Sequence, residues 1–188
     1  MVSRIIVALL IAGAFARGAD LDLTPQKQFS ELEGTRSEIT AFRYGQEFVT
    51  WTPPHRWRLV GGSSRVALFP PGATQADGLI ERLDLPAATA LDATYARTLK
   101  AEVAKALPRE ASALEWAEDE PNSLLLNRHP TYKITGSYTI SAQRYTKTIW
   151  VCNFAEHQLR FHLTTRAQDF EKLHEPLRQS LYSWQGLK

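Results

Sequence analysis

The sequence predicts an α+β protein, in which an antiparallel sheet has a central helix and a C-terminal helix packed on one face. Three observations support this prediction. Short β-rich runs bounded by proline and glycine occupy residues 48–85 and 123–165. Between these groups, residues 91–106 carry apolar side chains at helical spacing. The same spacing returns over residues 170–184.

The first group of strands is marked by turn residues at its boundaries. Strands are predicted at residues 48–52, 57–60, 65–69 and 78–85. Pro53 and Pro54 end the first of them, because proline cannot donate to a strand ladder. Residues 61–64 (GGSS) have neither the spacing of a phosphate-binding loop nor that of a nucleophile elbow, so they are expected to form a hairpin turn.

The central helix is predicted from its apolar stripe and from its ends. The apolar residues of the stripe are Leu91, Tyr95, Leu99, Val103 and Ala106. Thr89 or Asp92 can cap the N-terminus, and Pro108 stops the helix.

The second group of strands contains the clearest hairpin in the chain. Its strands are predicted at residues 123–126, 133–141, 148–154 and 158–165, with residues 155–157 joining the last two. Apolar and polar residues alternate over 133–141, which predicts one buried face. Over 158–165 the alternation places Leu159, Phe161 and Leu163 on one face and Arg160, His162 and Thr164 on the other.

The C-terminal helix is predicted from a second apolar stripe. Its members are Phe170, Leu173, Leu177, Leu181 and Trp184, and Asp169 lies near the positive end of the helix. Pro176 removes one helical hydrogen bond, so a bend or a break is expected there.

The N-terminus has the order of a secretory signal peptide. One positive charge precedes an apolar run over residues 5–15, which is shorter than the about 20 residues of a membrane span. We expect a signal peptide over residues 1–16, cut after Ala16 or, alternatively, after Ala19. A buried N-terminal helix and an uncleaved anchor are the other interpretations. The cleaved protein is expected to be periplasmic or secreted, without a stable transmembrane span.

The rest of the chain is expected to contain one domain. Residues 17–44 are polar and predict a lead-in segment, with or without a short helix, that contributes little to the core. Residues 45–188 are expected to form a single α+β domain, a length usual for one domain.

The charge balance and the single cysteine exclude two classes of protein. The formal net charge is +2, whereas a nucleic-acid-binding domain needs clustered excess positive charge. With only Cys152, no intramolecular disulfide can form. Cys152 is predicted to be a small buried hydrophobic residue. An exposed thiol that pairs with a second chain is the alternative.

No pattern in the sequence predicts a catalytic, cofactor or metal site. The five histidines are His55, His129, His157, His162 and His174, and none pair at the spacings of zinc sites. We therefore expect them to be solvated on the surface. The acidic residues Glu115, Glu118, Asp119 and Glu120 lack the ordered ligands of a calcium loop, so an exposed loop is expected. The protein is accordingly predicted not to be an enzyme.

The candidate partner surface is the segment that begins at Trp51. Tryptophan and arginine are the side chains most often found as binding anchors. We predict a partner surface formed by Trp51, His55, Arg56, Trp57 and Arg58. The alternative is that the tryptophans belong to the core. The row of Arg160, His162 and Thr164 would extend this surface only if no helix covers that face.

Three stretches of the chain resemble the PsbP-like fold family, which includes the extrinsic photosystem II protein and bacterial relatives. They are FVTWTPPHRW, the closing hairpin TIWVCNFAEHQLRFHLTTR and the helix DFEKLHEPLRQSLYSW, and the similarity covers about residues 45–185. The resemblance implies a non-enzymatic scaffold that binds other proteins or helps to assemble them. No metal or partner residue of the family could be matched to a residue of this sequence.

The expected function is that of an exported, non-enzymatic binding or assembly domain of the cell envelope, with a protein or envelope component as partner. Two alternatives remain open. An extracytoplasmic hydrolase would need a pocket where a Ser, Asp or Glu meets a histidine within hydrogen-bond reach. A small-ligand carrier would need a deep apolar cavity between helix and sheet.

Overall fold

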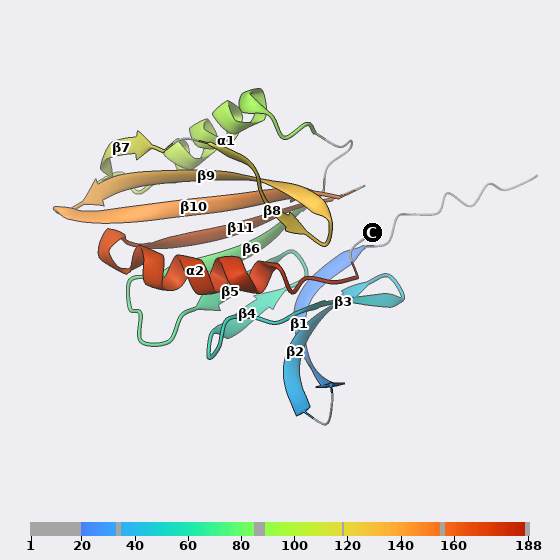
Figure 1. Cartoon of the computed structure of the whole chain (residues 1–188). Helices are drawn as coiled ribbons and strands as arrows, with labels where there is room; N and C mark the ends of the chain where they lie inside the picture. The colour runs from blue at the N-terminus through green and yellow to red at the C-terminus, as the bar shows by residue number, and fades with distance from the viewer. Residues whose placement is uncertain (1–19, 33–34, 85–88, 118, 155–156, 187–188) are drawn as a thin grey trace, which may run out of the picture.

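The computed structural model describes residues 20–32, 35–84, 89–117, 119–154 and 157–186. The signal peptide predicted over residues 1–16 lies outside this part of the chain. Within it, two antiparallel sheets and two α-helices form the fold (Figure 1).

The larger sheet has eight strands in the order β4-β5-β6-β11-β10-β9-β7, and β8 also pairs with β9. The strands are β4 (Arg58–Gly62), β5 (Arg65–Phe69), β6 (Asp77–Asp84), β7 (Ser112–Trp116), β8 (Glu120–Leu126), β9 (His129–Ile140), β10 (Gln143–Asn153) and β11 (His157–Arg166). Each pairing in this sheet is antiparallel. The predicted strands of both groups are present, and β7 is an edge strand that the sequence pattern did not reveal.

The smaller sheet has three strands, β1 (Leu21–Leu32), β2 (Thr35–Tyr44) and β3 (Glu47–Trp51), in that order. The backbone N–H of Leu23 in β1 donates to the carbonyl of Ser63, in the turn between β4 and β5, at 2.9 Å. This bond joins the small sheet to the edge of the large one.

The prediction of a polar lead-in over residues 17–44 is wrong, because β1 and β2 occupy most of this segment. Leu21, Leu23 and Phe42 are fully buried in the main core. Most of the remaining residues in these strands are polar, so the few apolar residues gave too short a pattern for a strand prediction. Burial of these three side chains in the core stabilises the two strands despite their polar composition.

Both predicted helices are present, but the C-terminal one ends at Leu181, three residues before Trp184, which belongs to the apolar stripe predicted over residues 170–184. Helix α1 (Ala93–Ala106) is capped by the Asp92 carboxylate, which accepts from the backbone N–H groups of Thr94 and Tyr95 at 2.8 and 2.9 Å. Helix α2 (Phe170–Leu181) follows a 3₁₀ turn, η1 (Ala167–Asp169). It continues through Pro176, so the break considered at this residue does not occur.

The α+β class with an antiparallel sheet, a central helix and a C-terminal helix is confirmed, but the helices lie on opposite faces of the large sheet rather than on one. Alternate residues of β10 show this arrangement. Ile149 belongs to the same buried cluster as Leu99 of α1, whereas Trp150 belongs to the cluster that contains Leu177 of α2. Figure 1 shows α2 across one face and α1 beyond the other. The large sheet therefore has apolar positions on both faces and divides the core in two.

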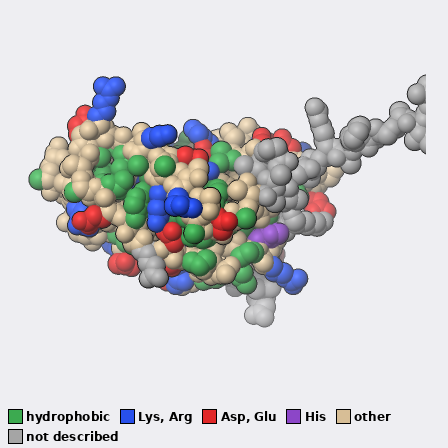
Figure 2. All heavy atoms as spheres, turned by 90° about the horizontal axis from the view of Figure 1, so that it is seen from above, with side chains coloured by type: hydrophobic (Ala, Val, Ile, Leu, Met, Phe, Trp, Pro, Cys, Tyr) green, Lys and Arg blue, Asp and Glu red, His purple; other side chains and the backbone are tan. Residues whose placement is uncertain are grey.

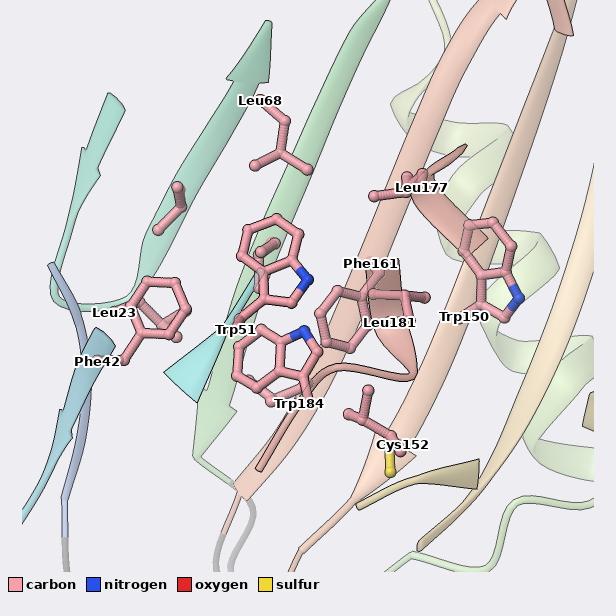
Figure 3. Close-up of a cluster of buried hydrophobic side chains, with 14 of the residues drawn as sticks. Leu23, Phe42, Trp51, Leu68, Trp150, Cys152, Phe161, Leu177, Leu181 and Trp184 are labelled. Atoms are coloured by element: carbon pink, nitrogen blue, oxygen red, sulfur yellow. The ribbon is translucent and has the colours of Figure 1, made fainter. Parts of the chain in front are cut away.

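Aromatic rings from both sheets and from the C-terminus meet in the main core (Figure 3). The Trp184 indole stacks on Phe42 and Trp51, with ring centroids 5.3 and 5.7 Å away, and meets Phe161 edge-on at 5.4 Å. Full burial of such a side chain contributes about 1.5–3 kcal/mol. This cluster therefore fixes the position of the small sheet and of the chain that follows β3.

Neither α1 nor α2 is long and apolar enough to cross a membrane, and no other helix in the described part of the chain is.

Candidate functional site

Two of the five residues predicted to form a partner surface lie in the core. Trp51 has no exposed surface, and Trp57 is 9% exposed. The Trp51 indole Nε1 donates a hydrogen bond to the backbone carbonyl of Ser180 at 3.1 Å. The prediction that these tryptophans are exposed is therefore wrong, and the alternative of core packing is correct. Burial of their large apolar surface stabilises the fold more than an exposed position would.

The other three residues, His55, Arg56 and Arg58, are exposed and line a groove of about 630 Å³. We call it the 52–58 groove. Its lining residues are Lys27, Glu38, Thr52, Pro53, Pro54, His55, Arg56, Trp57 and Arg58. The β1–β2 hairpin supplies one wall, and the chain between β3 and β4 supplies the other.

The chain that forms this second wall is held by hydrogen bonds to the C-terminal region. The backbone N–H of Thr52 donates to Ser183 Oγ at 2.9 Å, and Ser183 Oγ in turn donates to the carbonyl of Ser180 at 2.6 Å. The backbone N–H of Trp57 donates to the carbonyl of Pro54 at 3.1 Å, which closes a turn. With the buried tryptophans at both ends, these bonds give the loop a fixed shape.

The charges of the 52–58 groove are mostly positive. Lys27 and Glu38 form an ion pair at 2.9 Å, and the Arg58 guanidinium lies 4.3 Å from the centroid of the Phe69 ring. Arg56 has a φ of 63°, a left-handed conformation that costs a non-glycine residue about 1–2 kcal/mol. Among the described residues, no carboxylate lies within 4.0 Å of the Arg56 or Arg58 guanidinium.

A second polar site lies between α1 and the large sheet. This cavity has a volume of about 260 Å³, and we call it the α1 cavity. Its lining residues are Arg65, Leu79, Glu81, Leu99, Glu102, Val103, Ala106, Lys147, Arg160 and His162. Strands β5, β6, β10 and β11 supply the charged side chains of the sheet, and α1 supplies Glu102 and the apolar wall.

Glu81 and His162 are the buried titratable pair of this cavity. Glu81 is 8% exposed, and its Oε2 lies 3.6 Å from His162 Nε2, beyond normal hydrogen-bond length. The neighbouring imidazole and the Arg65 guanidinium hold the pKa of Glu81 at about 2, against the effect of burial. Burial lowers the pKa of His162 below its ordinary value, which favours the neutral ring.

Lys147 and Arg160 bring positive charge to the same cavity. Lys147 Nζ donates to Thr164 Oγ1 at 3.1 Å, and burial lowers the pKa of Lys147. Arg160 Nη1 donates to Glu102 Oε2 at 3.1 Å, and Arg160 Nε donates to Gln158 Oε1 at 2.7 Å. The guanidinium of Arg160 thus has acceptors in Glu102 and Gln158, whereas the ammonium of Lys147 has one neutral acceptor, the hydroxyl of Thr164.

The α1 cavity can be compared with the two functional alternatives raised by the sequence, a hydrolase and a small-ligand carrier. Glu81 Oε2 and His162 Nε2 approach each other, but their separation of 3.6 Å is outside the hydrogen-bond reach that a hydrolase would need. The cavity lies between helix and sheet, as a carrier would require, but five of its ten lining residues are charged. Its geometry supports binding of a small charged group.

The row of Arg160, His162 and Thr164 does not extend the predicted surface, because α1 lies over that face of the sheet. On the outside of this face, basic and acidic side chains are interspersed and form no single patch (Figure 2).

The sequence analysis did not identify Glu81 and Lys147 as residues of a site. In the sequence, alternation along β6 places Glu81 on the same face as Leu79. A carboxylate on a face that becomes buried needs a polar partner, and this was the available signal for a polar site.

The prediction that all five histidines are solvated is wrong for three of them. His157 and His174 are 8% exposed, and the side chain of His162 is 13% exposed. His174 stacks between Trp150 and Phe170, with centroid distances of 5.0 and 4.7 Å. Strand and helix periodicity placed these rings on inward faces, which residue type alone could not indicate.

Three other sequence expectations have a clear outcome. Cys152 is buried, as predicted, and burial raises the pKa of its thiol to about 12. Residues 61–64 form the predicted hairpin between β4 and β5. Glu115 and Glu120 lie in strands rather than in one exposed loop, and Asp119 pairs with Lys100. Within the described ranges, no three His, Cys, Asp or Glu side chains gather in a metal-binding arrangement.

No protein-family model and no curated protein matches this sequence. The solved structures that are similar in fold include two with TM-scores above 0.5. One is LpqN, described as involved in cell envelope biogenesis of Mycobacterium tuberculosis, at 13% identity and a TM-score of 0.52, covering 88% of this chain and 92% of LpqN. The other is the cyanobacterial PsbP (CyanoP) of Synechocystis, at 12% identity and a TM-score of 0.51, covering 95% of this chain and 99% of CyanoP. The chain therefore has a PsbP-like fold.

Proposed function

We propose that this protein is an exported, non-enzymatic binding protein of the cell envelope, and that it binds an acidic segment of a partner protein in the 52–58 groove. The observation that carries the proposal is the pair of exposed guanidinium groups of Arg56 and Arg58, neither paired with a carboxylate of the described residues. Arginine offers five donors in a planar fork that fits carboxylates.

The rigidity of the groove favours binding. Trp51 and Trp57 are buried on either side of the exposed residues, and Thr52 is bonded to Ser183. A surface that is already ordered loses less conformational entropy when a partner binds. The left-handed conformation of Arg56 is consistent with this interpretation, since strained residues cluster at functional sites.

Two further points support an envelope role. The N-terminal pattern predicts export, and LpqN, which shares the fold, is described as involved in cell envelope biogenesis. In the α1 cavity, Glu81 Oε2 and His162 Nε2 lie 3.6 Å apart, beyond normal hydrogen-bond length, which favours binding over hydrolysis.

The partner surface can be tested by affinity capture. The C-terminally tagged protein is used to capture proteins from the envelope fraction of its own cells, beside the double variant Arg56→Gln/Arg58→Gln. We expect a partner with an acidic segment whose recovery falls about tenfold with the double variant and with added salt. The charge-matched control is Arg97→Gln/Arg109→Gln, at two exposed positions outside the groove, and it should recover the partner normally. Equal recovery by the groove variant would refute this site.

Export is tested separately. Fractionation and N-terminal sequencing should give an extracytoplasmic protein that begins after Ala16 or Ala19. A cytosolic protein with an intact N-terminus would contradict the export part of the proposal and leave the groove to be judged by affinity capture.

A further inference from the structure

The α1 cavity is a separate feature from the 52–58 groove, and its charges do not cancel. Three of its lining residues are cations, Arg65, Lys147 and Arg160, and two are carboxylates, Glu81 and Glu102. Arg65 pairs with Glu81, and Arg160 pairs with Glu102. Lys147 is the third cation, and no carboxylate of the described residues lies within 4.0 Å of it.

Lys147 retains unused hydrogen-bonding capacity in a partly dehydrated place. An ammonium group has three donors, and the structure gives Lys147 one acceptor, the hydroxyl of Thr164 at 3.1 Å. A buried charge is costly unless it is paired. An anion beside Lys147 would supply the missing charge and further acceptors.

His162 adds a second unused polar atom to the cavity. Its Nε2 is buried and has no hydrogen-bond partner among the described residues, since Glu81 Oε2 is 3.6 Å away. An unsatisfied buried polar atom indicates a missing partner such as a ligand or a water molecule. A ring N–H at this position could donate to an oxygen of the same anion that pairs with Lys147.

The remaining lining and the size of the cavity define the rest of the ligand. Leu79, Leu99 and Val103 form an apolar wall beside the charged residues. The volume of about 260 Å³ lies below the roughly 300–1,000 Å³ of pockets for drug-sized ligands. The exposed side chains of Arg65 and Glu102 (67% and 53%) mark the opening to solvent.

We propose that the α1 cavity binds a small organic monocarboxylate, with its carboxylate on Lys147 and His162 and its hydrocarbon part against Leu99 and Val103. Lys147, which has no carboxylate of the described residues within 4.0 Å and feels Asp77 and Glu81 only from farther away, matches one negative charge. A phosphate dianion would bring a second charge close to Glu81 and Glu102, which disfavours it. The apolar wall gives hydrocarbon chains an advantage over inorganic anions of the same charge.

The test uses isothermal titration calorimetry on the purified full chain with the n-alkyl carboxylates from acetate to hexanoate, with butyramide and with inorganic phosphate. We expect saturable 1:1 binding of carboxylates that tightens with chain length until the cavity is filled. Butyramide, which keeps the shape of butyrate without its charge, should bind about tenfold more weakly or not at all. Phosphate binding that exceeds carboxylate binding would overturn the proposed ligand class.

Two variants locate the site. Lys147→Met keeps the length of the side chain and removes its charge, so carboxylate affinity should fall about tenfold or more. Lys105→Met makes the same change at an exposed position of α1 outside the cavity and should bind like the wild type. Unchanged affinity of Lys147→Met, or no saturable binding of any carboxylate by the wild type, would refute the proposal.

A measurement on the wild-type protein alone does not depend on whether a variant folds. A bound carboxylate favours the charged ammonium, so binding at alkaline pH should take up protons. Titrations in two buffers of different ionisation enthalpy measure this uptake. Binding without proton uptake at alkaline pH would place the carboxylate away from Lys147.

Discussion

The indole Nε1 of Trp51 donates a hydrogen bond to the backbone carbonyl of Ser180, 129 residues further along the chain, at 3.1 Å. Ser180 lies in the last turn of α2, where carbonyl groups have no N–H group four residues further along the helix, and its carbonyl also accepts from the backbone N–H of Ser183 at 3.0 Å. The bond therefore joins the small sheet to the end of the C-terminal helix. It also explains why a tryptophan next to an exposed loop is not itself a surface residue.

Trp51→Phe should lower the free energy of unfolding by about 2 kcal/mol, because it removes this hydrogen bond and leaves a small void in the core. The carbonyl of Ser180 keeps the Ser183 hydroxyl as a donor, so the penalty stays below that of an orphaned polar group. Urea unfolding followed by far-UV circular dichroism measures the change. The half-exposed Tyr182→Phe should change stability by less than about 0.5 kcal/mol. Equal stability of Trp51→Phe and wild type would argue against the buried position of Trp51.

His174→Phe should raise the free energy of unfolding at pH 7 by about 1 kcal/mol. His174 is packed between Trp150 and Phe170, and neither of its ring nitrogens has a hydrogen-bond partner among the described residues. An apolar ring of similar shape keeps the stacking and removes the cost of burying two polar atoms. Thermal unfolding of both proteins measures the difference, and a less stable variant would show that His174 has an unseen polar partner.

The same residue should make the protein sensitive to mild acid. Burial lowers the pKa of His174 below its ordinary value of 6.5. The unfolded state therefore binds a proton first as the pH falls, so this contribution to stability is complete above pH 6.5 and is lost on acidification below it. Its charged neighbours are Lys133, Glu171, Glu175 and Arg178. Stability measured from pH 7.5 to 5 should fall more steeply in the wild type than in His174→Phe.

Glu81 should control a second loss of stability at lower pH. Its pKa is about 2 in the folded protein, against an ordinary value of 4.5. The carboxylate therefore stabilises the fold above pH 4.5, and this contribution disappears as the pH falls from 4.5 to about 2. Glu81→Gln should be less stable at pH 7 and show a flatter profile in that window. A parallel profile for the two proteins would mean that Glu81 is not held as an anion.

Cys152 should be inert in the folded protein. Its thiol is buried, and burial raises its pKa to about 12, so the reactive thiolate is scarce at pH 8. Ellman's reagent should label it rapidly in urea and very slowly without denaturant. Lys105→Cys in a Cys152→Ala background provides an exposed thiol for comparison. Fast labelling of native Cys152 would contradict its burial.

Much of the fold could be predicted from local patterns. Alternation over residues 133–141 and 158–165, proline and glycine at the strand ends, and the Asp92 cap of α1 are short-range signals, and the structure contains the elements they predict. Strands β1 and β2 were missed because Leu21, Leu23 and Phe42 are too few to give a period. Their burial depends on the aromatic cluster around Trp184, which assembles only when distant segments meet.

The candidate sites were only partly predictable. His55, Arg56 and Arg58 are exposed as predicted, but the groove that they line also needs Lys27 and Glu38 from the missed hairpin. The α1 cavity collects residues from α1 and four strands, spread from Arg65 to His162. No local pattern in the sequence could bring these side chains together.

The sequence by itself determined which segments become strands or helices over most of the chain, because alternation, helical spacing and capping depend on near neighbours. Only the tertiary structure decided which face of the sheet each helix covers, since β10 offers apolar residues on both faces. It also decided that Trp51 is buried and that Lys147 has no paired carboxylate among the described residues. Burial and charge pairing depend on residues far away in the chain, and these become neighbours only on folding.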